Sequence, residues 1–310
     1  MQNGFGIRFS AIVSILLIPI WCHVCGAQQV DSILQSDRGD NRTLYTENER
    51  LFEQEKYVQA LGNCDRLLDK GIPSRVYNRI QATAIRCCLM LNRPEDAVRR
   101  VETIYERDPA SPYLSLLPLV WDDRLPSHER YVASPGDLRS ESILRQLSSA
   151  SALLQDSRYT ERCVEILKEL RSNRHLPVGI IAETQLWRIQ LTMTDSVHLP
   201  TVRRWQKRAA GLPESLRSGP QFIVGRAFQL RHKPDQAALE LLWLPLMQNH
   251  DPNLAASGLA EAIVCLEATG RSASAGRLRR ELLNRFPRTS AANHIKTFDS
   301  SSPSLLSPGE

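Results

Sequence analysis

The sequence predicts an all-α protein built from antiparallel helical hairpins. No stretch shows the sustained apolar–polar alternation with β-branched residues that is typical of strands. Along most of the chain, apolar residues recur instead at helical spacing. Four alanine-centred patterns with the same internal offsets also follow one another, as expected of repeated helix pairs.

Each pattern places a small residue early in the second helix of a pair. Two helices that pack closely need a side chain no larger than a methyl group where they cross. Seven residues beyond each alanine, a large aliphatic residue lies on the same helix face. The alanines are Ala60, Ala97, Ala237 and Ala275, and their aliphatic partners are Leu67, Ile104, Leu244 and Leu282.

The residues around the alanines fit a hairpin. Pro109 and Pro287 each fall twelve residues after an alanine, where a helix must end. Gly225 lies twelve residues before Ala237, which adds a second small residue to that crossing. The turns before the four alanines are Glu55-Lys56-Tyr57, Asn92-Arg93-Pro94, His232-Lys233-Pro234 and Gly270-Arg271-Ser272.

This pattern resembles the tetratricopeptide repeat (TPR) family, whose unit is a helix pair of about 34 residues. The family's first-helix tryptophan is absent from all four copies, so they resemble divergent repeats. The resemblance implies a TPR-like solenoid of antiparallel helix hairpins that binds partner segments in a groove lined by first helices. Those helices correspond to Thr46–Phe52, Ala82–Leu91, Gln221–Leu230 and Asn253–Leu266. An ordinary helical bundle is the alternative fold.

Residues 1–27 are typical of a secretory signal peptide. Arg8 supplies the positive charge, Ala11–Trp21 is the apolar region, and Cys25-Gly26-Ala27 offers small residues for cleavage. The apolar run is short for a membrane span, which needs about 20 residues. We expect a periplasmic or secreted protein that begins near Gln28, and retention as a membrane anchor is the alternative.

Composition shifts divide the remaining chain. Proline, serine and glycine interrupt the helical pattern after Trp121, and they dominate again from Asp299 onwards. The predicted segments are a polar linker (28–42), N-terminal TPR-like hairpins (43–121), an irregular connector (122–140), a helical TPR-like region (141–296) and a disordered tail (297–310). The connector is the expected boundary between the first two hairpins and the rest.

Charge and cysteine content favour no special chemistry. The net charge of +5 is far below that of a typical nucleic-acid-binding domain. The basic run Arg203–Arg208 is interpreted as a solvated helix face with Trp205 turned inward, and the alternative is a patch for anionic lipid, a polyanion or an acidic partner. Cysteines without metal-ligand spacing are expected in the core, and a disulfide from Cys64 to Cys87 or Cys88 is the alternative. The mature chain holds Cys64, Cys87, Cys88, Cys163 and Cys265.

Catalytic motifs are absent from the sequence. It contains no phosphate-binding glycine loop and no GxSxG elbow. His128-Glu129 begins like a zinc-protease HExxH motif, but Val132 occupies the second ligand position. We therefore assign no catalytic, cofactor-binding or metal-ligating residues.

The predicted function is an exported TPR-like scaffold that mediates protein–protein interaction without catalysis. Its partner would be another exported or cell-envelope protein, and not a nucleic acid. The alternative is a helical-toroid enzyme acting on cell-envelope polymers, with Asp122, Asp123 and Glu129 as its acids. Because neighbouring carboxylates usually point apart, helix capping or solvation is the favoured role for Asp122 and Asp123. A purely structural module of an envelope assembly is the third interpretation.

Overall fold

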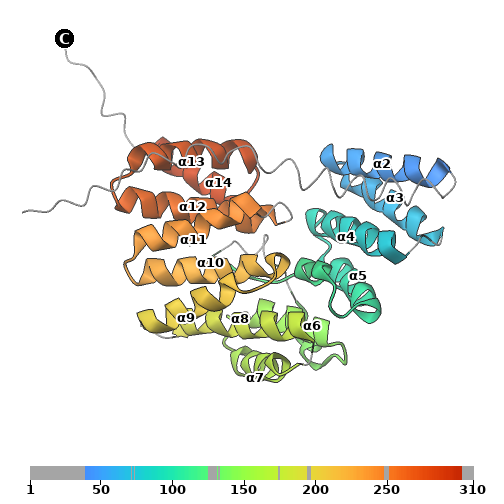
Figure 1. Cartoon of the computed structure of the whole chain (residues 1–310), viewed down its shortest axis with the longest axis horizontal. Helices are drawn as coiled ribbons and strands as arrows, with labels where there is room; N and C mark the ends of the chain where they lie inside the picture. The colour runs from blue at the N-terminus through green and yellow to red at the C-terminus, as the bar shows by residue number, and fades with distance from the viewer. Residues whose placement is uncertain are drawn as a thin grey trace, which may run out of the picture. The chain divides into compact units, whose positions relative to one another are not determined.

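The computed structural model describes residues 39–70, 72, 74–124, 131, 133–173, 175–193, 197–247 and 251–301 (Figure 1). Within these ranges all regular structure is helical, which confirms that the fold is all-α as predicted. The predicted signal peptide lies outside the described residues. The α-helices are α2 (Gly39–Glu53), α3 (Tyr57–Asp69), α4 (Ser74–Met90), α5 (Pro94–Arg107), α6 (Ile143–Leu153), α7 (Thr160–Arg171), α8 (Leu176–Met193), α9 (Leu199–Ala210), α10 (Glu214–Leu230), α11 (Pro234–Met247), α12 (Pro252–Ala268), α13 (Ser272–Arg285) and α14 (Ser290–Ser301), with 3-10 helices η1 (Pro112–Leu116) and η2 (Pro135–Arg139).

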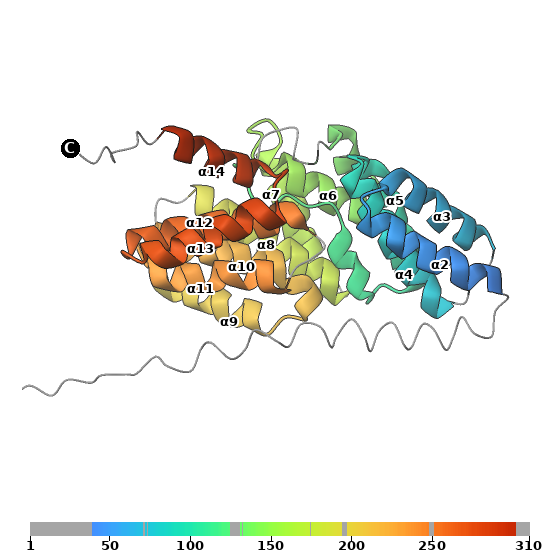
Figure 2. The ribbon, with the colours of Figure 1, turned by 90° about the horizontal axis from the view of Figure 1, so that it is seen from above.

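Contacts divide the chain into two compact units, Met1–Cys87 and Cys88–Glu310. In the first unit, α2 packs along α3 (Figure 2). The buried Asn48 amide of α2 donates to the Cys64 Sγ of α3 at 3.3 Å. An ion pair of 3.1 Å between Arg79 and Glu49 ties α4 to α2. This division falls inside α4, between Cys87 and Cys88.

In the second unit, each helix from α9 to α13 packs against the next one in the chain (Figure 1). The last helix, α14, lies against α12 (Figure 2). The core of this part combines aromatic residues of α8, α9 and α10 with aliphatic residues of α11, α12 and α13. Among the described residues, no helix is both long and apolar enough to span a bilayer.

The four predicted hairpins share one turn geometry. The residue five positions before each alanine has a positive φ: 60° at Glu55, 54° at Asn92, 53° at His232 and 75° at Gly270. The next residue donates its N–H to the carbonyl five residues back, over 2.8–3.0 Å in all four turns. This is the Schellman motif that ends many helices. The same backbone turn recurs although glycine occupies the left-handed position only once, so the four turns are structurally equivalent.

The alanines and their aliphatic partners lie where the pattern predicts. All eight side chains are buried. Gly225 of α10 also marks a close approach, because a Cβ placed there would lie 2.6 Å from Leu241 Cγ and 3.5 Å from the Ala237 carbonyl oxygen. Gly258 of α12 lies outside the predicted pattern, and a Cβ there would lie 2.7 Å from Leu244 Cδ1. Glycines therefore let both α10 and α12 approach α11 closely.

Two segment boundaries differ from the prediction. Helix α2 begins at Gly39, so residues 39–42 of the predicted linker are helical. Helix α14 continues to Ser301, which takes it into the predicted tail. The connector contains the 3-10 helix η2. Helix ends are weakly specified by sequence, because adding a turn to an existing helix needs no new nucleation.

Candidate functional site

A pocket of about 390 Å³ lies among α9, α10 and α11. This volume is within the range of ligand-binding pockets. Figure 1 shows these helices as successive layers of the second unit. Eight residues line the pocket, and six of them carry a charged or amide group: Arg203, Gln206, Lys207 and Ala210 from α9, Arg217 and Gln221 from α10, and Glu240 and Trp243 from α11.

Helical spacing explains why α9 contributes several side chains. Its lining residues are spaced i, i+3, i+4 and i+7, so they share one face. Trp205 lies on the opposite side, where it is buried and stacks on Trp187 with ring centroids 5.3 Å apart. The predicted inward orientation of Trp205 is therefore confirmed. Part of the basic run nevertheless lines a pocket, because Arg203 and Lys207 project from the other face.

The Glu240 carboxyl group lies in the inner part of the pocket, where the side-chain amides of Gln206 and Gln221 donate hydrogen bonds to it. Glu240 is only 8% exposed. Gln206 donates Nε2–H to Glu240 Oε1 at 2.6 Å, and Gln221 donates to Oε2. Burial raises the pKa of Glu240, and the hydrogen bond from Gln206 offsets part of that effect. Both direct donors are neutral, so this carboxyl group is not held in an ion pair.

Three basic side chains line the same pocket. The side chains of Arg203 and Lys207 are exposed, and neither has an ion-pair partner among the described residues. The Arg217 guanidinium lies over the Trp243 ring, 5.4 Å from its centroid, and donates Nη2–H to the Leu212 carbonyl at 2.8 Å. The entrance is therefore cationic, with an indole as one of its walls.

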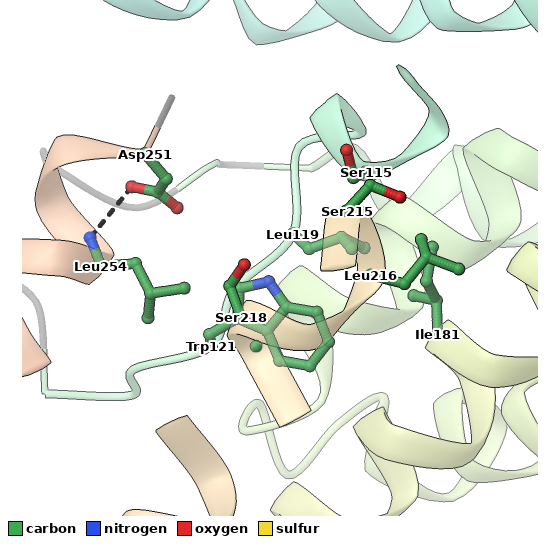
Figure 3. Close-up of a pocket in the computed structure, with 10 residues that line it drawn as sticks. Ser115, Leu119, Trp121, Ile181, Ser215, Leu216, Ser218, Asp251 and Leu254 are labelled. Atoms are coloured by element: carbon green, nitrogen blue, oxygen red, sulfur yellow. Dashed lines mark hydrogen bonds between the residues drawn. The ribbon is translucent and has the colours of Figure 1, made fainter. Parts of the chain in front are cut away.

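A second hollow, beside Trp121, is too small for an organic ligand (Figure 3). Its volume is about 40 Å³, close to the roughly 30 Å³ that one water molecule occupies in the liquid. Figure 3 shows the Trp121 indole between Leu254 on one side and Leu216 on the other. A Cβ on Gly219 would lie 2.1 Å from Trp121 Cε2, so the glycine admits this ring against α10. We interpret the hollow as a packing defect beside the connector.

The two candidate carboxylates that the structure describes, Asp122 and Asp123, are engaged in ion pairs. Asp122 is buried and accepts hydrogen bonds from Arg124 Nε at 2.9 Å and Nη2 at 3.0 Å. Burial opposes ionisation of Asp122, but hydrogen bonds and charge from Arg124 outweigh it and hold the pKa of that carboxyl below its usual value. Arg124 also pairs with Glu261. Asp123 Oδ1 lies 3.0 Å from Nη2 of the buried Arg188. The lowered pKa of Asp122 does not suit a general acid at neutral pH. Glu129 lies outside the described residues.

Arg188 also holds the backbone ahead of these acids. Its Nη1 donates to the Val120 carbonyl, and its Nη2 donates to the Ser151 carbonyl at 2.8 Å. Gln185 donates to the same Val120 oxygen at 3.2 Å. The Val120 N–H donates to Ser151 Oγ at 2.9 Å. These contacts satisfy an irregular, buried backbone segment, which is a structural role.

The remaining candidates from the sequence do not form a reactive centre in the described part of the chain. No disulfide joins the five described cysteines, all of which are buried. Burial raises the pKa of Cys163 and Cys265 to about 11. Within the described ranges no group of three His, Cys, Asp or Glu side chains could hold a metal ion.

The sequence did not reveal the pocket. The i, i+3, i+4 and i+7 spacing of the α9 residues can be seen in the sequence. Gln221 and Glu240, in contrast, come close to these residues only because α9, α10 and α11 pack together.

Comparison of the sequence with protein-family models found no match. No curated protein and no solved structure matches the chain either. The resemblance to TPR proteins therefore rests on the residues of this chain and on its hairpins.

Proposed function

We propose that this protein is an exported, TPR-like scaffold that mediates protein–protein interaction and carries out no catalysis. The observation that carries the proposal is the recurrence of one turn, with the same positive-φ position and hydrogen bonds, ahead of four buried alanines. Equivalent hairpins can stack into a solenoid, which presents an extended surface for partners. The signal-peptide pattern at residues 1–27 supports a periplasmic or secreted location, or membrane association if the segment is retained.

In this proposal, the partner is another exported or cell-envelope protein that contacts the first helices of the hairpins. In the second unit these helices are α10 and α12. Each carries an exposed aliphatic side chain near its C-terminal end, Leu230 at 51% exposure and Val264 at 49%. Exposed apolar side chains on adjacent first helices are suited to contact a partner.

The test is affinity capture with the full-length protein from its own envelope fraction. Leu230→Asp and Val264→Asp should reduce capture of a specific partner. Val58→Asp is the matched control, because Val58 is 70% exposed but lies on a second helix, α3. All three sites are exposed, so the variants should remain folded. Equal capture by all variants and the wild type would contradict a role for the first helices.

Turnover assays on peptidoglycan and other envelope glycans address the enzyme interpretation. Asp122, Asp123 and Glu129 would be replaced together by alanine, with helicity measured by circular dichroism. The scaffold proposal expects partner binding to persist in the folded triple variant. A hydrolytic activity of the wild type that this folded variant lacks would overturn the proposal.

A further inference from the structure

Helix α11 presents an apolar stripe to solvent. Leu239, Leu242, Trp243 and Leu246 are spaced i, i+3, i+4 and i+7, so they lie on one face of the helix. The outer two are highly exposed, Leu239 at 72% and Leu246 at 68%, while the inner two are half-buried. The opposite face, which includes Leu241, is fully buried in the core. This helix is therefore apolar both where it packs and where it meets solvent.

The α11 stripe adjoins the polar pocket. Trp243 belongs to both, since it lies in the stripe and also lines the pocket beside Glu240. Arg203 and Lys207 at the entrance have no ion-pair partner among the described residues. The α11 stripe thus borders a pocket that holds two cations without an ion-pair partner in the described part of the chain.

We propose that the α11 stripe and this pocket together bind an amphipathic helix of a partner protein, which places apolar side chains on the stripe and one carboxylate in the pocket. The spacing of the stripe matches the anchors of a helix laid on an apolar surface. The cations at the entrance complement a carboxylate. This surface goes beyond the proposed function, because α11 is the second helix of its hairpin and the proposed groove is lined by first helices.

The pocket favours a single carboxylate over a phosphate or a polyanion. Glu240 lies in its interior, and when ionised it would repel a dianion more strongly than a monoanion. Gln206 and Gln221 provide amide groups that can donate to or accept from a peptide. A nucleic acid or an anionic membrane would need a broad basic face, whereas the unpaired cations here converge on one cavity.

The binding experiment uses fluorescence anisotropy of labelled synthetic helices with the full-length protein. The peptides are about 14 residues long, or about four turns, with leucines at i, i+3, i+4 and i+7. A single glutamate is scanned along the flank of the apolar face, and each peptide has a glutamine counterpart. At one register, the glutamate peptide should bind up to about fivefold more tightly than its glutamine counterpart, the upper end of the range expected for exposed ion pairs.

Two sets of variants separate the stripe from the pocket. Leu239→Glu combined with Leu246→Glu should abolish binding of both peptides. Arg203→Gln combined with Lys207→Gln should remove only the preference for glutamate. Arg204→Gln is the matched control, because Arg204 lies exposed on the same helix but does not line the pocket. Thermal unfolding measured by circular dichroism should match the wild type for each variant.

Several results would overturn the inference. If no register shows a preference for glutamate, or if the preference persists in the variant that lacks both Arg203 and Lys207, the pocket is not part of the binding site. Phosphopeptides that bind more tightly than the glutamate peptides would contradict the carboxylate assignment. A dimer that Leu239→Glu dissociates would assign the stripe to a second copy of this chain, and stripe-dependent binding to phosphatidylglycerol vesicles would assign it to a membrane. The groove variants Leu230→Asp and Val264→Asp should not affect these titrations, so failure of the proposed groove remains distinguishable.

Discussion

Gly225→Ala is the sharpest test of how closely α10 and α11 pack. A Cβ at this position would lie 2.6 Å from Leu241 Cγ and 2.8 Å from Leu241 Cδ2. Carbon atoms pack without strain at about 3.5–4.0 Å, so Leu241 or a helix backbone must move. Leu241 is fully buried, which leaves it little free space into which to turn.

Two opposing effects set the magnitude. Replacing an interior helical glycine by alanine stabilises the folded state by about 1 kcal/mol through helix propensity. Overpacking a filled core destabilises it by about 1–3 kcal/mol. The net change at Gly225 should therefore lower the free energy of unfolding by about 0–2 kcal/mol.

Gly276→Ala provides the matched control within the same compact unit. Gly276 lies inside α13, and an added Cβ would meet nothing within 4 Å. This variant should keep the full propensity gain of about 1 kcal/mol. The two variants should therefore differ by about 1–3 kcal/mol, or about 2–12 °C in midpoint temperature for a unit of this size.

The assay is urea and thermal unfolding followed by circular dichroism. Leu241→Ala serves as the second change in a double-mutant cycle, because it removes the atoms nearest the added Cβ. In the Leu241→Ala background, Gly225→Ala should no longer give a lower free energy of unfolding than Gly276→Ala does. If Gly225→Ala stabilises the wild type as much as Gly276→Ala does, α10 and α11 do not approach as closely as we describe.

Four further predictions follow from burial, charge and sequence. Ala97 is fully buried, so Ala97→Leu should lower the free energy of unfolding by about 1–3 kcal/mol; an unchanged thermal midpoint would mean that the position is exposed. Cys163 and Cys265, with pKa values raised to about 11 by burial, should stay unmodified by a thiol reagent at about pH 8 until urea unfolds the chain. The pKa of Asp122 lies below its usual value, so its stabilising effect should be present above about pH 4 and lost as pH falls through the folded-state pKa; urea titrations should show wild type and Asp122→Asn converging at low pH. Intact-mass measurement of exported protein should show a chain that begins near Gln28, and a retained Met1 would support the anchor alternative.

The hairpin register could be predicted because its cause is local. The methyl-sized side chain at the helix crossing and the aliphatic residue two turns later belong to the same helix. Their spacing can therefore be seen in a single stretch of sequence. Ala237 and Leu244 illustrate this, since both are fully buried at the predicted positions. Gly225 was found by the same logic, because its spacing from Ala237 lies within one hairpin.

Features that depend on more than one hairpin could not be predicted in this way. Gly258 faces Leu244 of the preceding hairpin, so nothing in its own hairpin marks it. Glu240 looks like an ordinary surface residue in a helical sequence, yet Gln206 and Gln221 reach it from two other helices. The pocket is a product of packing, and its polar residues have no sequence spacing that identifies them in advance.

The hydrogen bonds to the Val120 carbonyl make the position of that carbonyl, and not its side chain, the fixed feature of the segment. Arg188 and Gln185 belong to α8, and they supply donors that an α-helix would have found in its own backbone. These hydrogen bonds therefore fix which residue of the segment lies opposite α8. A one-residue insertion between Pro118 and Val120 would leave the composition almost unchanged, but it would offer Arg188 the wrong carbonyl. Such an insertion should be tolerated less well than a conservative substitution of the buried Val120 side chain.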